Sequence, residues 1–333
     1  MKRNIIQIFV ITLIAIVFTS CGNDSPTPST PKKVAPKKQV IVPKFNQDSA
    51  YRYVKEQVDF GPRIPGSKAH TACAAYLSQK LKSFGATVIE QRFKTRAFDG
   101  TILSGVNIIA SYNPNASKRV LLCAHWDSRP FADHDPDLSN YHTPIDGAND
   151  GASGVGVLME IARQIQSQPL DIGIDIVLFD IEDYGQPSDS ELPQIQDSWG
   201  LGSQYWSKTP HTPGYRARFG ILLDMVGAKD IIFTKEYFSM GYASGVVEKV
   251  WNRAAQLGYG EIFKNIEAGS VMDDHVYVNK YAQIPTIDII HYVEGSEAGF
   301  FPHWHTVKDN MDAIEASSLN VVGHVVLEVI YHE

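Results

Sequence analysis

Hydrophobic positions along the chain follow two patterns, one typical of helices and one typical of buried strands. Apolar residues recur every three or four positions over about 48–58, 67–84, 151–165, 201–207, 244–256 and 318–331, which predicts helices there. Strand-like patterns predict strands over about 86–94, 102–112, 119–126, 174–183, 219–227, 231–236 and 284–292, and several of these segments are nearly continuous apolar runs. Strands of this kind that alternate with helices predict an α/β fold, in which helices flank a central mixed, mostly parallel sheet.

The first 44 residues depart from this pattern. Residues 1–20 carry two basic residues and then an apolar run that ends at Phe18. The run is short of the roughly 20 residues of a spanning helix and predicts a secretory signal peptide. The sequence FTSC at 18–21 resembles a bacterial lipobox, so we expect a lipidated Cys21; a plain signal peptide or an uncleaved anchor is the alternative. Residues 21–44 are rich in Pro and Lys without aromatic residues, which predicts a disordered tether.

These N-terminal segments predict the location and organisation of the protein. We expect an exported protein, held through Cys21 on the periplasmic or cell-surface side of a bacterial membrane, with a single catalytic domain over 45–333.

Charge and cysteine content narrow the class of protein. The chain has 30 Lys and Arg residues against 37 Asp and Glu residues, a net charge of −7. An acidic body repels phosphate backbones, so we expect no nucleic-acid partner; we also expect a monomer. Cys73 and Cys123 are predicted to be buried thiols, with one disulfide between them as the alternative.

Residues that can bind a metal follow several predicted strands. His125 closes one apolar strand, the pair Glu182 and Asp183 closes another, and Asp224 closes a third. Ligands of an open α/β sheet bind beyond the carboxyl ends of its strands, so we expect these side chains at one edge. Further candidates lie in the connecting segments: Asp127, Asp150, Asp273, Asp274, His275, Trp304 and His305.

Each of these residues alone has a plain structural explanation, such as a helix cap at Asp150 or a core histidine at His125. Together they would place many carboxylates at one edge without a counter-charge, which is unfavourable unless a cation binds. Carboxylates and imidazoles without a nearby cysteine suit Zn²⁺. Because neighbours at a strand end point in opposite directions, one residue of the Glu182-Asp183 pair can hold the metal while the other acts as a base.

The sequence lacks the HExxH, G-x-S-x-G and P-loop motifs, and a glycosidase with paired carboxylates is a distant alternative. Seven segments instead resemble, in order, the animal-type glutaminyl-peptide cyclotransferases (glutaminyl cyclases), which are related to bacterial zinc aminopeptidases. The segments are RIPGS (63–67), AHWDSRP (124–130), GANDGASGVGVLMEIAR (147–163), LFDIEDYG (178–185), ILLDMVGA (221–228), SVMDDH (270–275) and WHTVKDN (304–310). The resemblance implies a zinc aminopeptidase-like α/β sandwich that converts the N-terminal glutamine of peptides and proteins to pyroglutamate and releases ammonia.

The resemblance also implies the roles of individual residues. It implies one zinc ion per chain, with Glu182 as the general acid/base. Asp224 and Asp273 match an acidic hydrogen-bond network around the leaving amide nitrogen. The implied zinc ligands are Asp150, Asp183 and His305.

The substrate pocket implied by the resemblance is aromatic. Trp304 matches a pocket wall and Phe300 matches an aromatic residue at the mouth, while Trp199 is expected to replace a second family tryptophan that would fall near position 188. The chain departs from the animal enzymes at four positions that affect the hydrogen-bond network or substrate binding: Gly151 for Ser, Asp183 for Glu, Met272 for Gln and Asp288 for His.

Two other functions remain open at this point. A two-zinc aminopeptidase would use as ligands His125, Asp150, Asp183, Asp224 and His305, all of which are present. A catalytically inactive binding module on a tether is disfavoured, because the base Glu182 and the implied ligands are intact.

Overall fold

Six strands form the central sheet of the computed structural model, which describes residues 40–292, 295 and 299–333. Their order is β1-β2-β4-β3-β5-β8. β1 pairs antiparallel with β2, and β2 pairs antiparallel with β4, whereas the other three pairs are parallel. The predicted mixed, mostly parallel sheet is therefore confirmed. The strands are β1 (Thr87–Arg96), β2 (Ile102–Tyr112), β3 (Arg119–His125), β4 (Gly173–Phe179), β5 (Gly220–Asp224) and β8 (Thr286–Ile290).

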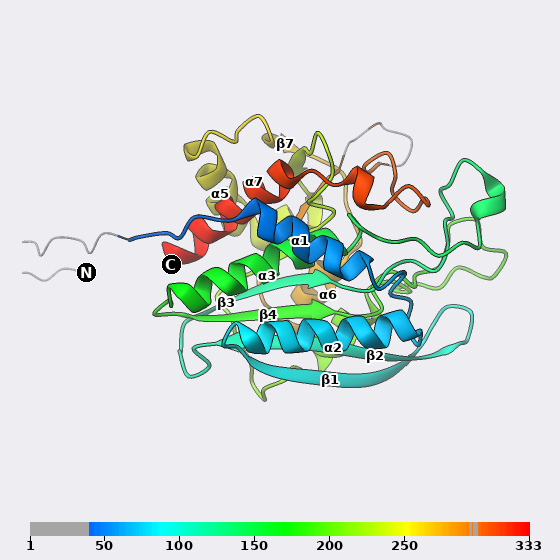
Figure 1. Ribbon diagram of the computed structural model, residues 1–333, viewed down its shortest axis with the longest axis horizontal. Coiled ribbons are helices and arrows are strands. Elements are labelled where there is room, and N and C mark those ends of the chain that lie inside the picture. Colours follow the sequence, from blue (N-terminus) through cyan, green and yellow to red (C-terminus); the bar gives the residue numbers. More distant parts are fainter. Residues whose placement is uncertain (1–39, 293–294, 296–298) are drawn as a thin grey trace, which may run out of the picture. The chain divides into compact units, whose positions relative to one another are not determined.

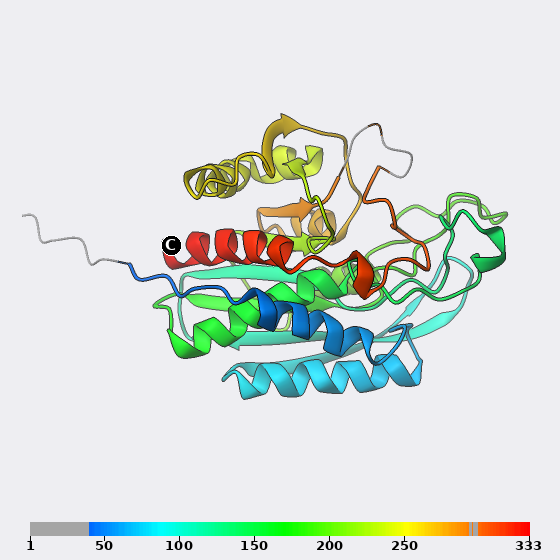
Figure 2. The same ribbon diagram turned by 45° about the horizontal axis from the view of Figure 1, so that its top comes forward.

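Helices cover both faces of this sheet. One face packs against α1 (Gln47–Val58), α2 (Lys68–Ser83), α3 (Ala152–Ser167), α5 (Tyr237–Gln256) and α7 (Ala316–Tyr331), of which α1, α2, α3 and α7 lie together in both ribbon views (Figures 1 and 2). The other face packs against α4 (Leu201–Lys208) and the π-helical turn η2 (Val278–Ala282). Within β3, Leu122 and Ala124 join the first core, while Leu121 and Cys123 join the second. This burial on both sides explains the continuous apolar runs.

Helix α5 begins seven residues before its predicted start. Glu236 caps it by accepting hydrogen bonds from the main-chain N–H groups of Phe238 and Ser239. A non-helical residue, Ala243, interrupts the helix next to the predicted start at Ser244. The first two turns carry exposed tyrosines and lack an apolar period, so the hydrophobic pattern could not indicate them.

Several short elements were not predicted. The strand predicted over 231–236 is present as β6 (Phe233–Lys235), but β7 (Phe263–Glu267), with which it forms a separate two-stranded sheet, was not predicted. The other unpredicted elements are α6 (Asp274–Tyr277), η2, and the 3-10 turns η1 (Leu138–Asn140) and η3 (Met311–Ala313). Both Cys73 and Cys123 are buried and free, as expected.

The predicted export segment lies outside the described residues, as do Cys21 and the tether up to residue 39. Among the residues that the structure describes, no helix is long and apolar enough to cross a membrane.

Candidate active site

All nine residues singled out for catalysis, metal binding and substrate binding line one cavity of about 230 Å³. The cavity lies beyond the carboxyl ends of β4 and β5, where the strand-end argument places it. Met225, Ser270, Val271, Met272 and Ile290 complete its lining. The nine residues are Asp150, Glu182, Asp183, Trp199, Asp224, Asp273, Phe300, Trp304 and His305.

Asp150, Asp183 and His305 form a group that fits a zinc ion. His305 Nε2 lies 3.4 Å from Asp183 Oδ1 and 3.7 Å from Asp150 Oδ2. A tetrahedral zinc with ligands at about 2.0–2.2 Å keeps its ligand atoms about 3.3–3.6 Å apart. Asp183 is 1% exposed, yet its carboxylate accepts no hydrogen bond within the described residues. A buried carboxylate that accepts no hydrogen bond is costly, so a cation suits this position.

The protonation of the three candidate ligands follows from their surroundings. Burial, followed by the charge of Arg129, lowers the pKa of His305 to about 4, so its imidazole is neutral at pH 7. Burial and then the neighbouring Asp150 raise the pKa of Asp183 well above its ordinary value. A neutral imidazole is the form that binds a metal, and a bound cation would favour the ionised form of Asp183.

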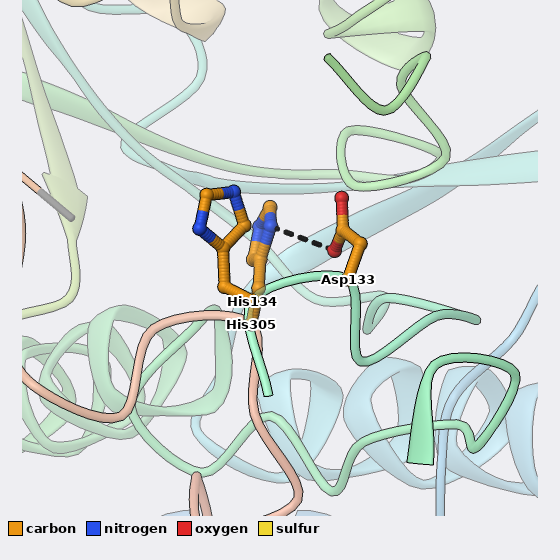
Figure 3. A group of neighbouring side chains, drawn as sticks. All are labelled: Asp133, His134 and His305. Carbon is orange, nitrogen blue, oxygen red and sulfur yellow. Dashed lines mark ion pairs between the residues drawn. The ribbon is translucent and has the colours of Figure 1, made fainter. Parts of the chain in front are cut away.

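His305 is held in place by a carboxylate that the sequence did not reveal. Its Nδ1 lies 3.2 Å from Oδ1 of Asp133, and the two side chains point toward each other beside His134 (Figure 3). Burial would raise the pKa of Asp133, but hydrogen bonds from Arg129 and His305 keep that pKa far below its ordinary range. A carboxylate behind a histidine fixes its tautomer and ring orientation, as in many metal sites.

Glu182 and Asp183 lie in a turn and not at the end of a strand, which corrects the prediction. β4 ends at Phe179, and Ile181 has a φ of 55°, which is rare for a β-branched residue. The buried carboxylate of Asp127 accepts hydrogen bonds from the main-chain N–H groups of both Glu182 and Asp183, each at 3.1 Å. Asp127 therefore fixes the backbone of the pair.

Glu182 has the environment of a general base. Burial raises its pKa well above the ordinary value, and the charges of Asp273 and Asp183 add to this although His125 opposes it. A glutamate whose pKa is raised accepts a proton more readily than an ordinary carboxylate does, which suits a general base that must also return the proton.

A second group, formed by His125, Asp150 and Asp224, adjoins the first. His125 Nε2 lies 3.0 Å from Asp150 Oδ1 and 3.2 Å from Asp224 Oδ1. Burial alone would lower the pKa of His125, but the carboxylates of Asp127, Asp150 and Asp224 raise it well above its ordinary value. In the absence of metal, a protonated His125 therefore offsets the charge of the carboxylates around it.

Buried acids continue behind Asp224. Asp273 caps α6 by accepting a hydrogen bond from the main-chain N–H of Asp274. Burial raises the pKa of both Asp273 and Asp288, and their mutual interaction raises that of Asp288 further, so this pair can share a proton. His275 lies between this pair and Glu236: its Nδ1 is 3.9 Å from Asp288 Oδ2, and its Nε2 is 3.1 Å from Glu236 Oε2.

Aromatic rings close the cavity around the candidate metal ligands. The rings of Trp304 and His305 stack, with centroids 3.8 Å apart, and Phe300 lies 4.7 Å from Trp304. Trp199 lies nearly parallel to His305, at 14° and 5.9 Å. Its ring also packs against the guanidinium of Arg129, which is the counter-charge that the sequence analysis did not expect at this edge.

Comparison with known proteins agrees with this geometry. The model of peptidase family M28 matches residues 107–330, which is more than half of the chain. The chain belongs to peptidase family M28. Among solved M28-like structures, it is similar to a Zn-dependent exopeptidase from Parabacteroides distasonis, at 54% identity and a TM-score of 0.87, over 88% of this chain and 100% of that one.

Glutaminyl cyclases are also among the similar proteins. The structure of Bacteroides thetaiotaomicron glutaminyl cyclase bound to N-acetylhistamine matches at 53% identity and a TM-score of 0.86, over 88% of this chain and 100% of that one. The glutaminyl-peptide cyclotransferase of Gloydius blomhoffii is 25% identical over 295 residues, which cover 79% of this chain and 75% of that one. The resemblance inferred from the motifs is therefore confirmed, and the M28 chain has the fold of an enzyme.

Proposed function

We propose that this M28 protein is a glutaminyl cyclase, which converts the N-terminal glutamine of peptides and proteins to pyroglutamate and releases ammonia, with one zinc ion per chain. The observation that carries the proposal is the position of Glu182, in a small aromatic cavity directly beside the group Asp150, Asp183 and His305. A volume of about 230 Å³ accommodates roughly one residue, which suits an enzyme that acts on a chain terminus. The similarity to glutaminyl cyclases supports the same substrate class.

The chain's own residues can carry out the reaction as follows. Asp150, Asp183 and His305 would hold the zinc, which when bound supplies a Lewis acid that polarises the γ-carboxamide carbonyl. Glu182 takes a proton from the α-amino group of the substrate, so that the α-amino nitrogen can attack the carboxamide carbon. Glu182 then returns this proton to the carboxamide nitrogen, the bond from that nitrogen to carbon breaks, and ammonia leaves.

The remaining side chains orient the substrate and exclude water. Burial, together with the neighbouring Asp150 and Asp273, raises the pKa of Asp224 to about 7 although His125 bonds to it. Asp224 and Asp273 can therefore donate or accept hydrogen bonds at the departing nitrogen. Trp199, Phe300 and Trp304 keep water from the reacting carbon, where it would cause hydrolysis of the amide.

A two-zinc aminopeptidase is the alternative, because His125 and Asp224 form a second possible metal group with Asp150. In the metal-free site, His125 pairs with both carboxylates, which raise its pKa although burial alone would lower it, so that its ring carries a proton. A second metal would have to displace that proton. Tight binding of two zinc ions per chain would instead support the aminopeptidase.

Export and lipid attachment are part of the proposal and rest on the sequence alone. The lipobox-like FTSC segment and the Pro- and Lys-rich tether support a protein that is lipidated at Cys21 and faces the periplasm or the cell exterior. Metabolic labelling with a fatty acid tests this: labelling that is lost in Cys21→Ser is expected, and a protein that is never labelled would refute it.

The roles of Glu182 and Asp183 give the sharpest test of the mechanism. Glu182→Gln keeps the shape of the side chain but cannot carry a proton, so it should retain zinc and lose activity by about 10²–10⁴-fold. Asp183→Ala removes a ligand, so zinc content and activity should fall together. Metal analysis of both variants beside the unmodified protein measures this. If Glu182→Gln stayed active, or if it lost zinc while Asp183→Ala kept it, the assigned roles would be wrong.

A further inference from the structure

Arg129 is fully buried beside the candidate metal ligands, four residues after the end of β3. Its Nε and Nη2 donate hydrogen bonds to the two carboxylate oxygens of Asp133, at 2.7 and 2.6 Å. Its Nη1 donates to the main-chain carbonyls of Asp183 and Gly185, at 2.9 and 3.2 Å. A single guanidinium therefore connects two loops that are distant in the sequence.

These contacts reach two of the three candidate zinc ligands. The bonds to the carbonyls of Asp183 and Gly185 hold the backbone of the first ligand, and Nη1 also lies 3.6 Å from Asp183 Oδ1. The second ligand, His305, is reached through Asp133, whose Oδ1 faces His305 Nδ1 at 3.2 Å (Figure 3). Arg129 thus fixes where the two ligands stand relative to each other.

The same side chain supports the aromatic wall of the cavity. Cζ of Arg129 lies 4.6 Å from the centroid of the Trp199 ring, close enough for cation–π stacking. Trp199 in turn lies nearly parallel to His305. Movement of the guanidinium would therefore disturb the metal ligands and the substrate wall together.

We propose that Arg129 is a positioning residue that holds Asp183, His305 and Trp199 as one unit. The inference rests on the proposed zinc site. A planar guanidinium can form the fork with Asp133, donate to both carbonyls and stack on Trp199 at once, whereas the ammonium of a lysine is a point charge that cannot. Loss of partners behind metal ligands typically weakens metal binding by about 10–100-fold.

The test compares Arg129→Lys with a matched control, Arg119→Lys. Arg119 likewise contacts both carboxylate oxygens of an aspartate, Asp175, through two guanidinium nitrogens. Arg119 lies at the start of β3, however, at the opposite end of the strand from the cavity. Zinc affinity is measured by competition with a chromophoric chelator, and KM and kcat are measured for a Gln-peptide at saturating zinc. We expect Arg129→Lys to weaken zinc binding by about 10–100-fold and, with zinc restored, to raise KM more than it lowers kcat. Arg119→Lys should change none of these quantities.

An unchanged zinc affinity in Arg129→Lys would overturn the inference, as would an equal loss in Arg119→Lys. If Arg129→Lys does not fold, Asp133→Asn serves instead, because an amide cannot accept from the Arg129 fork and from His305 together. The zinc affinity of Asp133→Asn should fall. An unchanged zinc affinity in this variant would also overturn the inference. A failure of the proposed zinc site is distinguishable from both, because the unmodified protein would then bind no zinc, or Asp183→Ala would bind it equally well. A failure of the proposed function is distinguishable as well, because the unmodified protein would bind zinc without releasing ammonia from the Gln-peptide.

Discussion

The imidazole of His125 lies directly against the α-carbon of Gly151. A Cβ at position 151 would lie 2.5 Å from His125 Cε1 and 2.6 Å from both ring nitrogens, which no side chain tolerates without movement. The missing side chain thus makes room for the His125 ring between the carboxylates of Asp150 and Asp224.

A side chain at position 151 should consequently displace His125. We expect Gly151→Ala to cost about 1–3 kcal/mol of unfolding free energy, since it forces the ring away from carboxylates that then lose their partner. Activity should fall with it. Gly245→Ala in α5 is the control, because a Cβ there meets nothing within 4 Å, and alanine should slightly stabilise that helix. Equal stability of the two variants in urea unfolding would contradict the role of this contact.

Asp127 should matter for activity although it does not line the cavity. Asp127→Asn replaces one acceptor oxygen with an amide that cannot accept, so either Glu182 or Asp183 loses a main-chain hydrogen bond. We expect kcat to fall by at least about tenfold, because the turn also holds the unusual φ of Ile181. Steady-state kinetics measures this beside Asp48→Asn on the exposed side of α1, which should behave like the unmodified protein. Full activity of Asp127→Asn would exclude this function of the carboxylate.

The metal-free protein should become less stable as the pH rises toward neutrality. The pKa of Asp224 is raised from 3.8 to about 7 by burial first, so its contribution is complete below about pH 4 and is lost as the pH rises through 7. His305, with a pKa of about 4, contributes in the opposite direction. His305 is present in both the unmodified protein and Asp224→Asn, so its contribution cancels when the unfolding free energies of the two proteins are compared.

We therefore expect Asp224→Asn to gain stability over the unmodified protein between pH 4 and pH 7, by about 2–4 kcal/mol at the upper end. Thermal unfolding of protein treated with a chelator measures the difference. Added zinc should reduce it, because the cation stabilises the ionised carboxylates nearby. A difference that does not depend on pH would mean that Asp224 keeps its ordinary pKa.

The sequence predicted the sheet and the cavity lining because both depend on strong local patterns. Apolar runs define β2, β3, β4 and β5, and the polar residues that follow the three parallel strands β3, β4 and β5 collect at one edge by topology alone. The turn at Ile181 was missed, because the apolar run continues through it. The start of α5 was missed because its first turns are stabilised by the cap at Glu236 and not by an apolar period.

The residues that hold the site in place could not be found in this way. Arg129 and Asp133 lie in a long loop without a period, and their partners are about 50 and 170 residues away in the chain. One available signal was electrostatic: a lone arginine in AHWDSRP, next to an edge rich in carboxylates, could have been proposed as their counter-charge.

The central claim is that the M28 chain cyclises N-terminal glutamine and does not release N-terminal residues. Mass spectrometry after incubation of the zinc-loaded protein with two peptides, identical except for Gln or Leu at the first position, tests it most directly. We expect the Gln-peptide to lose one ammonia, the Leu-peptide to stay intact, and Glu182→Gln to leave both unchanged. No loss of ammonia from the Gln-peptide would contradict the account, and release of free leucine at a rate comparable with cyclisation would contradict it and favour the two-zinc aminopeptidase.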